Sequence, residues 1–125
     1  MPPERRHVSV LVVDDDRDIR EILDEVLTDA GYSVVGASNG VEALTCLGKC
    51  EPELILLDLN MPVMTGQQFR ARQLATPEIA SIPTVVMTAV DRPDERTREL
   101  HASEVLAKPV ELRQILATVA RYCRT

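Results

Sequence analysis

The 125-residue chain contains no long hydrophobic run, no even set of cysteines and no excess of basic side chains. No apolar stretch approaches the roughly 18–20 residues that a membrane-spanning helix needs, so we expect no membrane contact. Twenty acidic side chains against fourteen basic ones give a formal net charge of -6. Proteins that coat nucleic acid or anionic membranes need clustered Lys and Arg instead. The composition therefore argues against both kinds of partner.

The cysteines are too few and wrongly spaced for a disulfide framework or a metal site. Cys46, Cys50 and Cys123 cannot all pair within the chain, and no signal-peptide pattern opens the sequence, so we expect a reduced, cytoplasmic compartment. A spacing of four would place Cys46 and Cys50 on one face of a helix. A Gly-rich phosphate loop is also missing, which argues against nucleotide or flavin binding.

Short apolar runs alternate with amphipathic segments along the whole chain. The apolar runs predict buried strands at 8–13, 32–37, 54–57, 84–87 and 105–107. Helical spacing predicts helices over 19–30, 40–47, 66–74, 91–101 and 112–123, the first with Asp16 as its N-cap. Apolar strands alternating with helices indicate a doubly wound α/β fold with a parallel sheet. The length suits a single domain with its core at about 7–124.

Polar side chains follow several of the predicted strands. They are Asp14, Asp15 and Asp16 after the first strand, Asp58 after the third, Thr88 after the fourth and Lys108 after the fifth. Ligands of open parallel sheets bind at this carboxyl edge. Two carboxylates ~4 Å apart repel by about 4 kcal/mol at an effective dielectric near 20, which a divalent cation relieves. Oxygen ligands favour Mg²⁺, and a carboxylate beside Lys and Thr suits phosphoryl transfer.

Four motifs in this order resemble those of the response-regulator receiver domains of two-component signalling. They are LVVDDD at 11–16, LLDLNMP at 56–62 with Gly66, VMTA at 86–89 and KP at 108–109. The resemblance covers essentially the whole chain, as one receiver domain over 1–125. It implies a CheY-like (flavodoxin-like) five-stranded parallel sheet of order 2-1-3-4-5 with helices on both faces.

The resemblance also implies a phosphorylation site. Asp58 would accept a phosphoryl group from a histidine kinase or a histidine phosphotransfer protein. Asp15 and Asp58 would bind Mg²⁺ through their side chains, Asn60 through its backbone carbonyl and Asp14 through water. The chain would then be a self-phosphorylating acceptor rather than a turnover enzyme, it would be a monomer or weak dimer, and a downstream protein would read its surface.

The same resemblance assigns residues on the later strands. Thr88 and Lys108 would contact phosphoryl oxygens, and Ala89 would leave room for them. The bond between Lys108 and Pro109 is often cis in this family, a state open to proline. Only two of the fourteen basic residues are lysines. Because the remaining basic residues are arginines, a lysine at a strand end indicates a specific role for Lys108.

Several positions depart from the family pattern. Val105 stands where an aromatic switch residue is common, and Val110 stands in place of a frequent Phe after the Pro. His101 lies where the family often has Gly. Val90 is apolar and would shield the phosphoryl group, so we expect slow self-dephosphorylation. These departures concern the output surface and leave the acidic motifs unchanged.

Other functions remain compatible with the residues. A constitutive protein-binding module would keep the fold without phosphorylation, and a Mg²⁺-dependent phosphatase would use a similar aspartate nucleophile. A receiver excised from a hybrid kinase would have the same motifs as a free-standing one.

Overall fold

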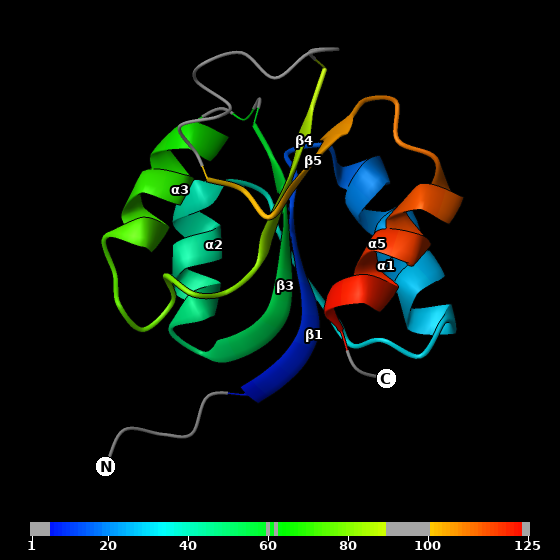
Figure 1. The fold of residues 1–125 in the computed structure, drawn as a ribbon, viewed down its shortest axis with the longest axis horizontal. Coiled ribbons are helices and arrows are strands. Elements are labelled where there is room, and N and C mark those ends of the chain that lie inside the picture. The colour runs from blue at the N-terminus through cyan, green and yellow to red at the C-terminus, as the bar shows by residue number, and fades with distance from the viewer. Residues whose placement is uncertain (1–5, 60, 62, 90–100, 124–125) are drawn as a thin grey trace.

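The computed structural model describes residues 6–59, 61, 63–89 and 101–123, and within these ranges the strands alternate with helices (Figure 1). The strands are β1 (Arg6–Val13), β2 (Val34–Ala37), β3 (Cys50–Asp58), β4 (Thr84–Thr88) and β5 (Glu104–Ala107). The described helices are α1 (Arg17–Asp29), α2 (Gly40–Leu47), α3 (Gly66–Leu74) and α5 (Leu112–Tyr122). All strand pairs are parallel and the order is β2-β1-β3-β4-β5, which confirms the predicted fold class.

Helices cover both faces of the sheet. Figure 1 shows α1 and α5 on one side and α2 and α3 on the other. Successive residues of a strand point to opposite faces, so Val10 packs in the core cluster that includes Ile115 of α5. Leu11 packs in a second cluster with Phe69 of α3. This two-sided burial explains why the strands are continuous apolar runs rather than alternating ones.

Side-chain caps determine where the helices begin. Asp16 is the N-cap of α1, as predicted, and its Oδ1 accepts from the amides of Asp18 at 2.9 Å and Ile19 at 3.3 Å. Asn39 caps α2 by accepting from the Glu42 amide at 2.9 Å. A capping box between Thr65 and Gln68 opens α3. Each cap satisfies amides that the first helical turn leaves without a partner.

The second and third strands differ in extent from the predicted ones. β3 begins at Cys50, four residues before the predicted start at 54, because it pairs with the whole length of β1 from Arg6 onward. β2 begins at Val34 rather than at 32 because the chain first turns at Gly31, which has a φ of 98°. Tyr32 is nevertheless buried against the core.

The prediction that Cys46 and Cys50 share a helix face is wrong. Cys46 lies in α2, which ends at Leu47 with Gly48 as its C-cap, and Cys50 is the first residue of β3. Gly48 and Lys49 turn the chain by donating to the carbonyls of Thr45 and Cys46. All three cysteines are free thiols, and burial raises the pKa of Cys123 to about 12.

Of the helix predicted over 91–101, only its last residue lies within the described ranges. That residue, His101, has a φ of 50°, and its carbonyl accepts from Nη2 of the buried Arg70 at 2.9 Å. A left-handed φ explains why glycine suits this position. Among the described helices, none has the length and apolar character needed to cross a bilayer.

Val63 carries an unfavourable backbone conformation on the loop between β3 and α3. Its φ is 69°, a left-handed value that is rare for a β-branched residue. Its side chain is 81% exposed, so little packing offsets the steric cost, which is about 1–2 kcal/mol.

We therefore expect Val63→Asn to raise the free energy of unfolding by about 1 kcal/mol, because asparagine tolerates left-handed backbone better. Urea unfolding of both proteins measures the difference. Val41→Asn is the matched control, since Val41 is also exposed but lies in the regular helix α2. A Val63→Asn protein no more stable than the parent would contradict the assignment of strain.

Candidate functional site

Three carboxyl groups converge at the carboxyl edge of the sheet. Asp14 and Asp15 directly follow β1, and Asp58 is the last residue of the neighbouring strand β3. One carboxylate oxygen from each lies within 4.8 Å of the others. Asp14 and Asp58 are each 1% exposed, whereas Asp15 is exposed. The parallel register, which pairs Val13 with Leu57, brings the strand ends together.

Lys108 is the cation that faces this cluster. Its Nζ donates to Oδ1 of Asp58 at 3.0 Å and lies 3.9 Å from Oδ2 of Asp14. The Lys108 amide donates to the Thr88 carbonyl at 2.7 Å, which holds the end of β5 beside the end of β4. The peptide bond from Lys108 to Pro109 is cis, as the family resemblance implied. The lysine is thereby held against two buried carboxyl groups.

The ionised form of Asp14 is disfavoured by its surroundings. Burial raises its pKa above 3.8, and the nearby Asp58 and Asp15 act in the same direction. The Asp16 amide donates to Oδ1 of Asp14 at 2.9 Å, and Lys108 is attractive; both effects lower the pKa. Its Oδ2 has no hydrogen-bond partner within the described part of the chain. A buried acceptor of this kind costs free energy until a donor or cation reaches it.

The donor set suits a hard divalent cation. All three groups offer carboxylate oxygens, the ligand type that Mg²⁺ prefers, and one of those oxygens is buried and unpartnered. The residues present therefore fit the predicted Mg²⁺. Asn60, the expected backbone ligand, lies outside the described residues.

The predicted phosphoryl-contacting residues surround the same edge. Thr88 ends β4 and is 2% exposed, while Ala89 beyond it is exposed. Val105 lies on β5 and packs, half-buried, against the core cluster on the α2 and α3 side. Val90 lies outside the described residues. Thr88 and Ala89 thus lie at the carboxyl end of β4, beside the end of β3 that carries Asp58, and their contacts with a phosphoryl group stay predictions.

One contributor to the site was not predicted. Arg20 of α1 donates from Nη1 to the backbone carbonyl of Asp14 at 2.7 Å and passes close to Gly36 of β2. It holds the loop between β1 and α1 and adds positive charge beside the acids. The sequence offered no specific signal, because Arg20 is one of many arginines and its partner is a backbone atom.

Gly66, part of the acidic motif around Asp58, fills a position with no room for a side chain. A Cβ there would lie 2.6 Å from Cα of Leu59 and 2.7 Å from the carbonyl oxygen of Asp58. The Gly66 amide also donates to the Leu59 carbonyl at 3.1 Å. The start of α3 thus packs directly against the backbone that presents Asp58.

We expect Gly66→Ala to lower the free energy of unfolding by about 1–3 kcal/mol, because the new methyl group meets backbone atoms that cannot yield cheaply. Urea unfolding measures the loss. Gly48→Ala is the control, because its Cβ would meet only Thr45 O at 3.4 Å; this variant should be no less stable than the parent. Equal behaviour of the two variants would show that the contact at Gly66 is unimportant.

We also expect Asp14→Asn to stabilise the protein at pH 7 without divalent cations. The raised pKa means that ionising Asp14 disfavours the folded state. This cost is absent below about pH 3.8, grows as the pH rises from there to the pKa of the folded state, and is constant above it. Asparagine keeps the acceptor for the Asp16 amide. Urea midpoints should therefore differ at pH 7 and converge at low pH.

Glu25→Gln, an exposed change on α1 that removes the same charge, serves as the control and should alter stability by less than about 0.5 kcal/mol. An Asp14→Asn protein less stable at pH 7 than the parent would mean that attraction to Lys108 outweighs burial.

Comparison with known proteins gives one consistent family. The model of the response regulator receiver domain matches residues 10–120. The chain is 36% identical over 116 residues to sporulation initiation phosphotransferase F of Bacillus subtilis, covering 91% of this chain and 92% of that protein. It is 38% identical over 119 residues to response regulator MprA of Mycobacterium sp. (strain KMS), covering 94% of this chain. The chain spans about half, 51%, of the length of MprA.

Solved structures give the same result. Chemotaxis protein CheY4 of Vibrio cholerae superposes with a TM-score of 0.84 at 32% identity, over 95% of this chain and 99% of that one. Response regulator TrrA of Thermotoga maritima superposes with a TM-score of 0.78 at 28% identity, over 94% and 98% of the two chains. With the family model matching most of its length, the chain belongs to the response-regulator receiver domains of two-component signalling.

Proposed function

We propose that this receiver domain accepts a phosphoryl group on Asp58 from a phosphohistidine of a histidine kinase or histidine phosphotransfer protein. The observation that carries the proposal is the position of Asp58, which is buried within a carboxylate cluster yet bonded to Lys108. A structural domain gains nothing from burying Asp14 and Asp58 together, because their repulsion costs stability. A phosphoryl-transfer site explains the arrangement, because a bound cation and the phosphoryl group would interact with these charged side chains.

The transfer itself needs few protein groups. An oxygen of Asp58 attacks phosphorus, a P–O bond forms as the P–N bond to histidine breaks, and the leaving imidazole keeps the bonding electron pair. Lys108 neutralises charge that collects on the phosphoryl oxygens. Asp15 and Asp58 would hold Mg²⁺ through their side chains, Asp14 through water and Asn60 through its backbone carbonyl, and the ion would supply further neutralising charge.

Relatives with known names support both the phosphoryl transfer and the Mg²⁺ binding in this proposal. The relative from Bacillus subtilis is named a phosphotransferase, and the structure of TrrA is a complex with Mg²⁺ and BeF. At 36% and 28% identity these proteins share the fold and the family. We propose that this chain also binds Mg²⁺, because its own acidic cluster provides the oxygen ligands.

Phosphorylation would act as a switch on a protein-binding surface. New charge-assisted bonds from Thr88 and Lys108 to the phosphoryl group would favour one conformer. Shifting a 1:99 population to 99:1 takes about 5.5 kcal/mol. Since Val105 has no ring to reorient, the change would travel through the β4 and β5 backbones, which pair Thr88 with Ala107. The downstream protein would read the surface around the fourth predicted helix, β5 and α5; most of that helix, predicted over 91–101, lies outside the described residues.

We propose an acceptor that is phosphorylated once, and not a turnover enzyme. With acetyl phosphate and Mg²⁺, the full chain should gain one base-labile phosphoryl group by intact mass, and Asp58→Asn should abolish it. Asp29→Asn, at the far end of α1, should be phosphorylated like the parent. Lys108→Ala should slow phosphorylation by about 10–100-fold, because it removes a donor to developing charge.

Either of two results would contradict the proposal and indicate a different function. If the parent protein gains no phosphate, the chain is a phosphorylation-independent binding module. If it hydrolyses phosphomonoesters over many turnovers with Mg²⁺, it is a phosphatase.

A further inference from the structure

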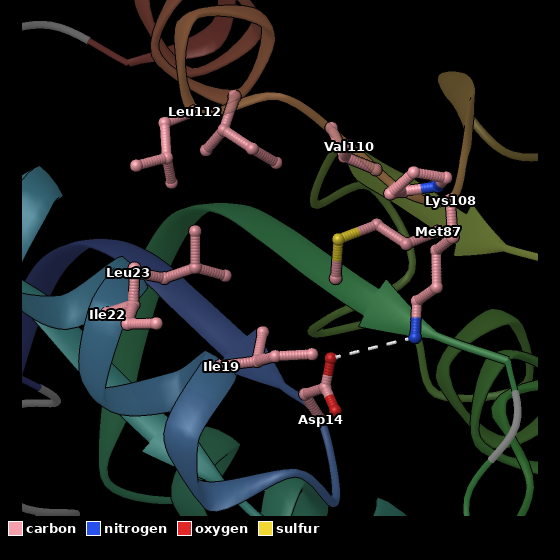
Figure 2. Close-up of a pocket in the computed structure, with 10 residues that line it drawn as sticks. Asp14, Ile19, Ile22, Leu23, Met87, Lys108, Val110 and Leu112 are labelled. Atoms are coloured by element: carbon pink, nitrogen blue, oxygen red, sulfur yellow. Dashed lines mark ion pairs between the residues drawn. The ribbon is translucent and has the colours of Figure 1, made fainter.

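The backbone of Asp14 is held from two sides at the end of β1. Its amide donates to the Ala37 carbonyl of β2 at 3.1 Å. Its carbonyl accepts from Nη1 of Arg20, on α1, at 2.7 Å. Figure 2 shows the carboxylate of Asp14 turned toward Lys108, with the ion pair between them as a dashed line. The backbone and the side chain of Asp14 therefore have separate partners, and the contact from Arg20 is to the backbone.

Two elements hold the side chain of Arg20 in place. Arg20 lies in the first turn of α1, where its own amide donates to the Asp16 carbonyl at 3.1 Å. Its Cδ lies 3.6 Å from where a Cβ would stand on Gly36 of β2. The half-buried arginine stem therefore passes along β2 on its way to the end of β1. Because both α1 and β2 are regular elements, the guanidinium has a fixed position at the Asp14 carbonyl.

The carbonyl that Arg20 contacts belongs to the peptide group between Asp14 and Asp15. A peptide group is planar, so a fixed carbonyl also fixes the direction of the following N–H and Cα. That Cα carries the Asp15 carboxylate, which offers one of the three oxygens that lie within 4.8 Å of one another. Asp15 is exposed, so packing does little to orient it. The bond from Arg20 therefore determines the position from which Asp15 reaches the acidic cluster.

The charge of Arg20 and its hydrogen bond have opposite consequences for a bound cation. A guanidinium near the three carboxylates repels Mg²⁺. A bond that fixes the backbone of a ligand residue instead favours coordination, as other contacts outside the ligand shell do. The hydrogen bond of Arg20 ends on a backbone oxygen and not on a carboxylate. This is the arrangement expected of a residue that fixes geometry.

We propose that Arg20 is a positioning residue for the cation site: its bond to the Asp14 carbonyl orients Asp15 for Mg²⁺ and strengthens Mg²⁺ binding despite the added positive charge. The inference rests on the proposed function, because Mg²⁺ is the cation that phosphorylation of Asp58 would use. It adds to that function a residue of α1 that lies outside the acidic motifs. Removing contacts of this kind typically weakens metal binding by about 10–100-fold.

Titration of the full chain with Mg²⁺ at constant ionic strength, followed by amide NMR shifts, tests this role. Arg20→Gln should raise the Kd for Mg²⁺ at least about tenfold, because the shorter side chain does not reach the Asp14 carbonyl. If Arg20 acted through its charge alone, the sign would be opposite, since removing a positive charge near the carboxylates lowers the Kd. Arg20→Lys keeps the charge but loses the guanidinium, so it should also weaken Mg²⁺ binding.

Arg17→Gln is the matched control. Arg17 lies on the same helix and has the same charge, but its Nε donates to Glu21 at 2.9 Å and its side chain is 81% exposed. This variant should bind Mg²⁺ at least as tightly as the parent. Without Mg²⁺, the amide nitrogen resonance of Asp15 should move further in Arg20→Gln than in Arg17→Gln, because this nitrogen shares a peptide group with the Asp14 carbonyl. Urea midpoints confirm that each variant is folded.

Phosphorylation by acetyl phosphate separates this inference from the proposed function. In Arg20→Gln, the Mg²⁺ concentration that gives half the maximal rate should rise at least about tenfold. The rate at saturating Mg²⁺ should stay within about twofold of that of the parent, because Asp58, Thr88 and Lys108 are unchanged. A Kd for Mg²⁺ in Arg20→Gln equal to or below that of the parent would overturn the inference and leave the proposed function intact. A parent protein that binds no Mg²⁺ would overturn both.

Discussion

Asp14 and Asp58 are two carboxyl groups that folding places side by side, almost fully out of solvent, at the ends of adjacent strands. Their repulsion is the constraint on which the rest of the site depends. Lys108 offsets part of it through its bond to Asp58, but it stays 3.9 Å from Asp14. The folded chain therefore holds an unbalanced negative charge at this edge of the sheet, which suits a cation there.

Holding these groups in place requires a rigid backbone around them. Gly66 allows α3 to pack directly on the carbonyl of Asp58, and the amide of Lys108 is bonded to the Thr88 carbonyl. Arg20 fixes the carbonyl of Asp14, and Asp16 begins α1 immediately afterwards. Each contact involves the backbone on at least one side, so the positions of the charges follow mainly from the strand register.

Local patterns predicted most of this arrangement. Strands buried on both faces are continuous apolar runs, and caps such as Asp16 act within three residues, so both are visible in sequence. The placement of polar residues after strand ends followed from the parallel topology. The helix pairing of Cys46 and Cys50 failed because spacing alone ignores the turn at Gly48. The bond from Arg20 to Asp14 joins two elements, and periodicity does not encode such contacts.

Two valines, Val105 and Val110, stand where the family resemblance led us to expect aromatic residues. Val105 packs only partly into the α2 and α3 side of the sheet, and Val110 lines an apolar cavity of about 550 Å³ with residues of α1 and α5. Both lie on the segment that carries Lys108, so this lysine has less bulky packing around it than rings would supply. In the proposed switch, the response would therefore depend more on the electrostatic balance among Lys108, Asp14 and Asp58. A phosphoryl group on Asp58 and a bound cation would both act on these three charged side chains.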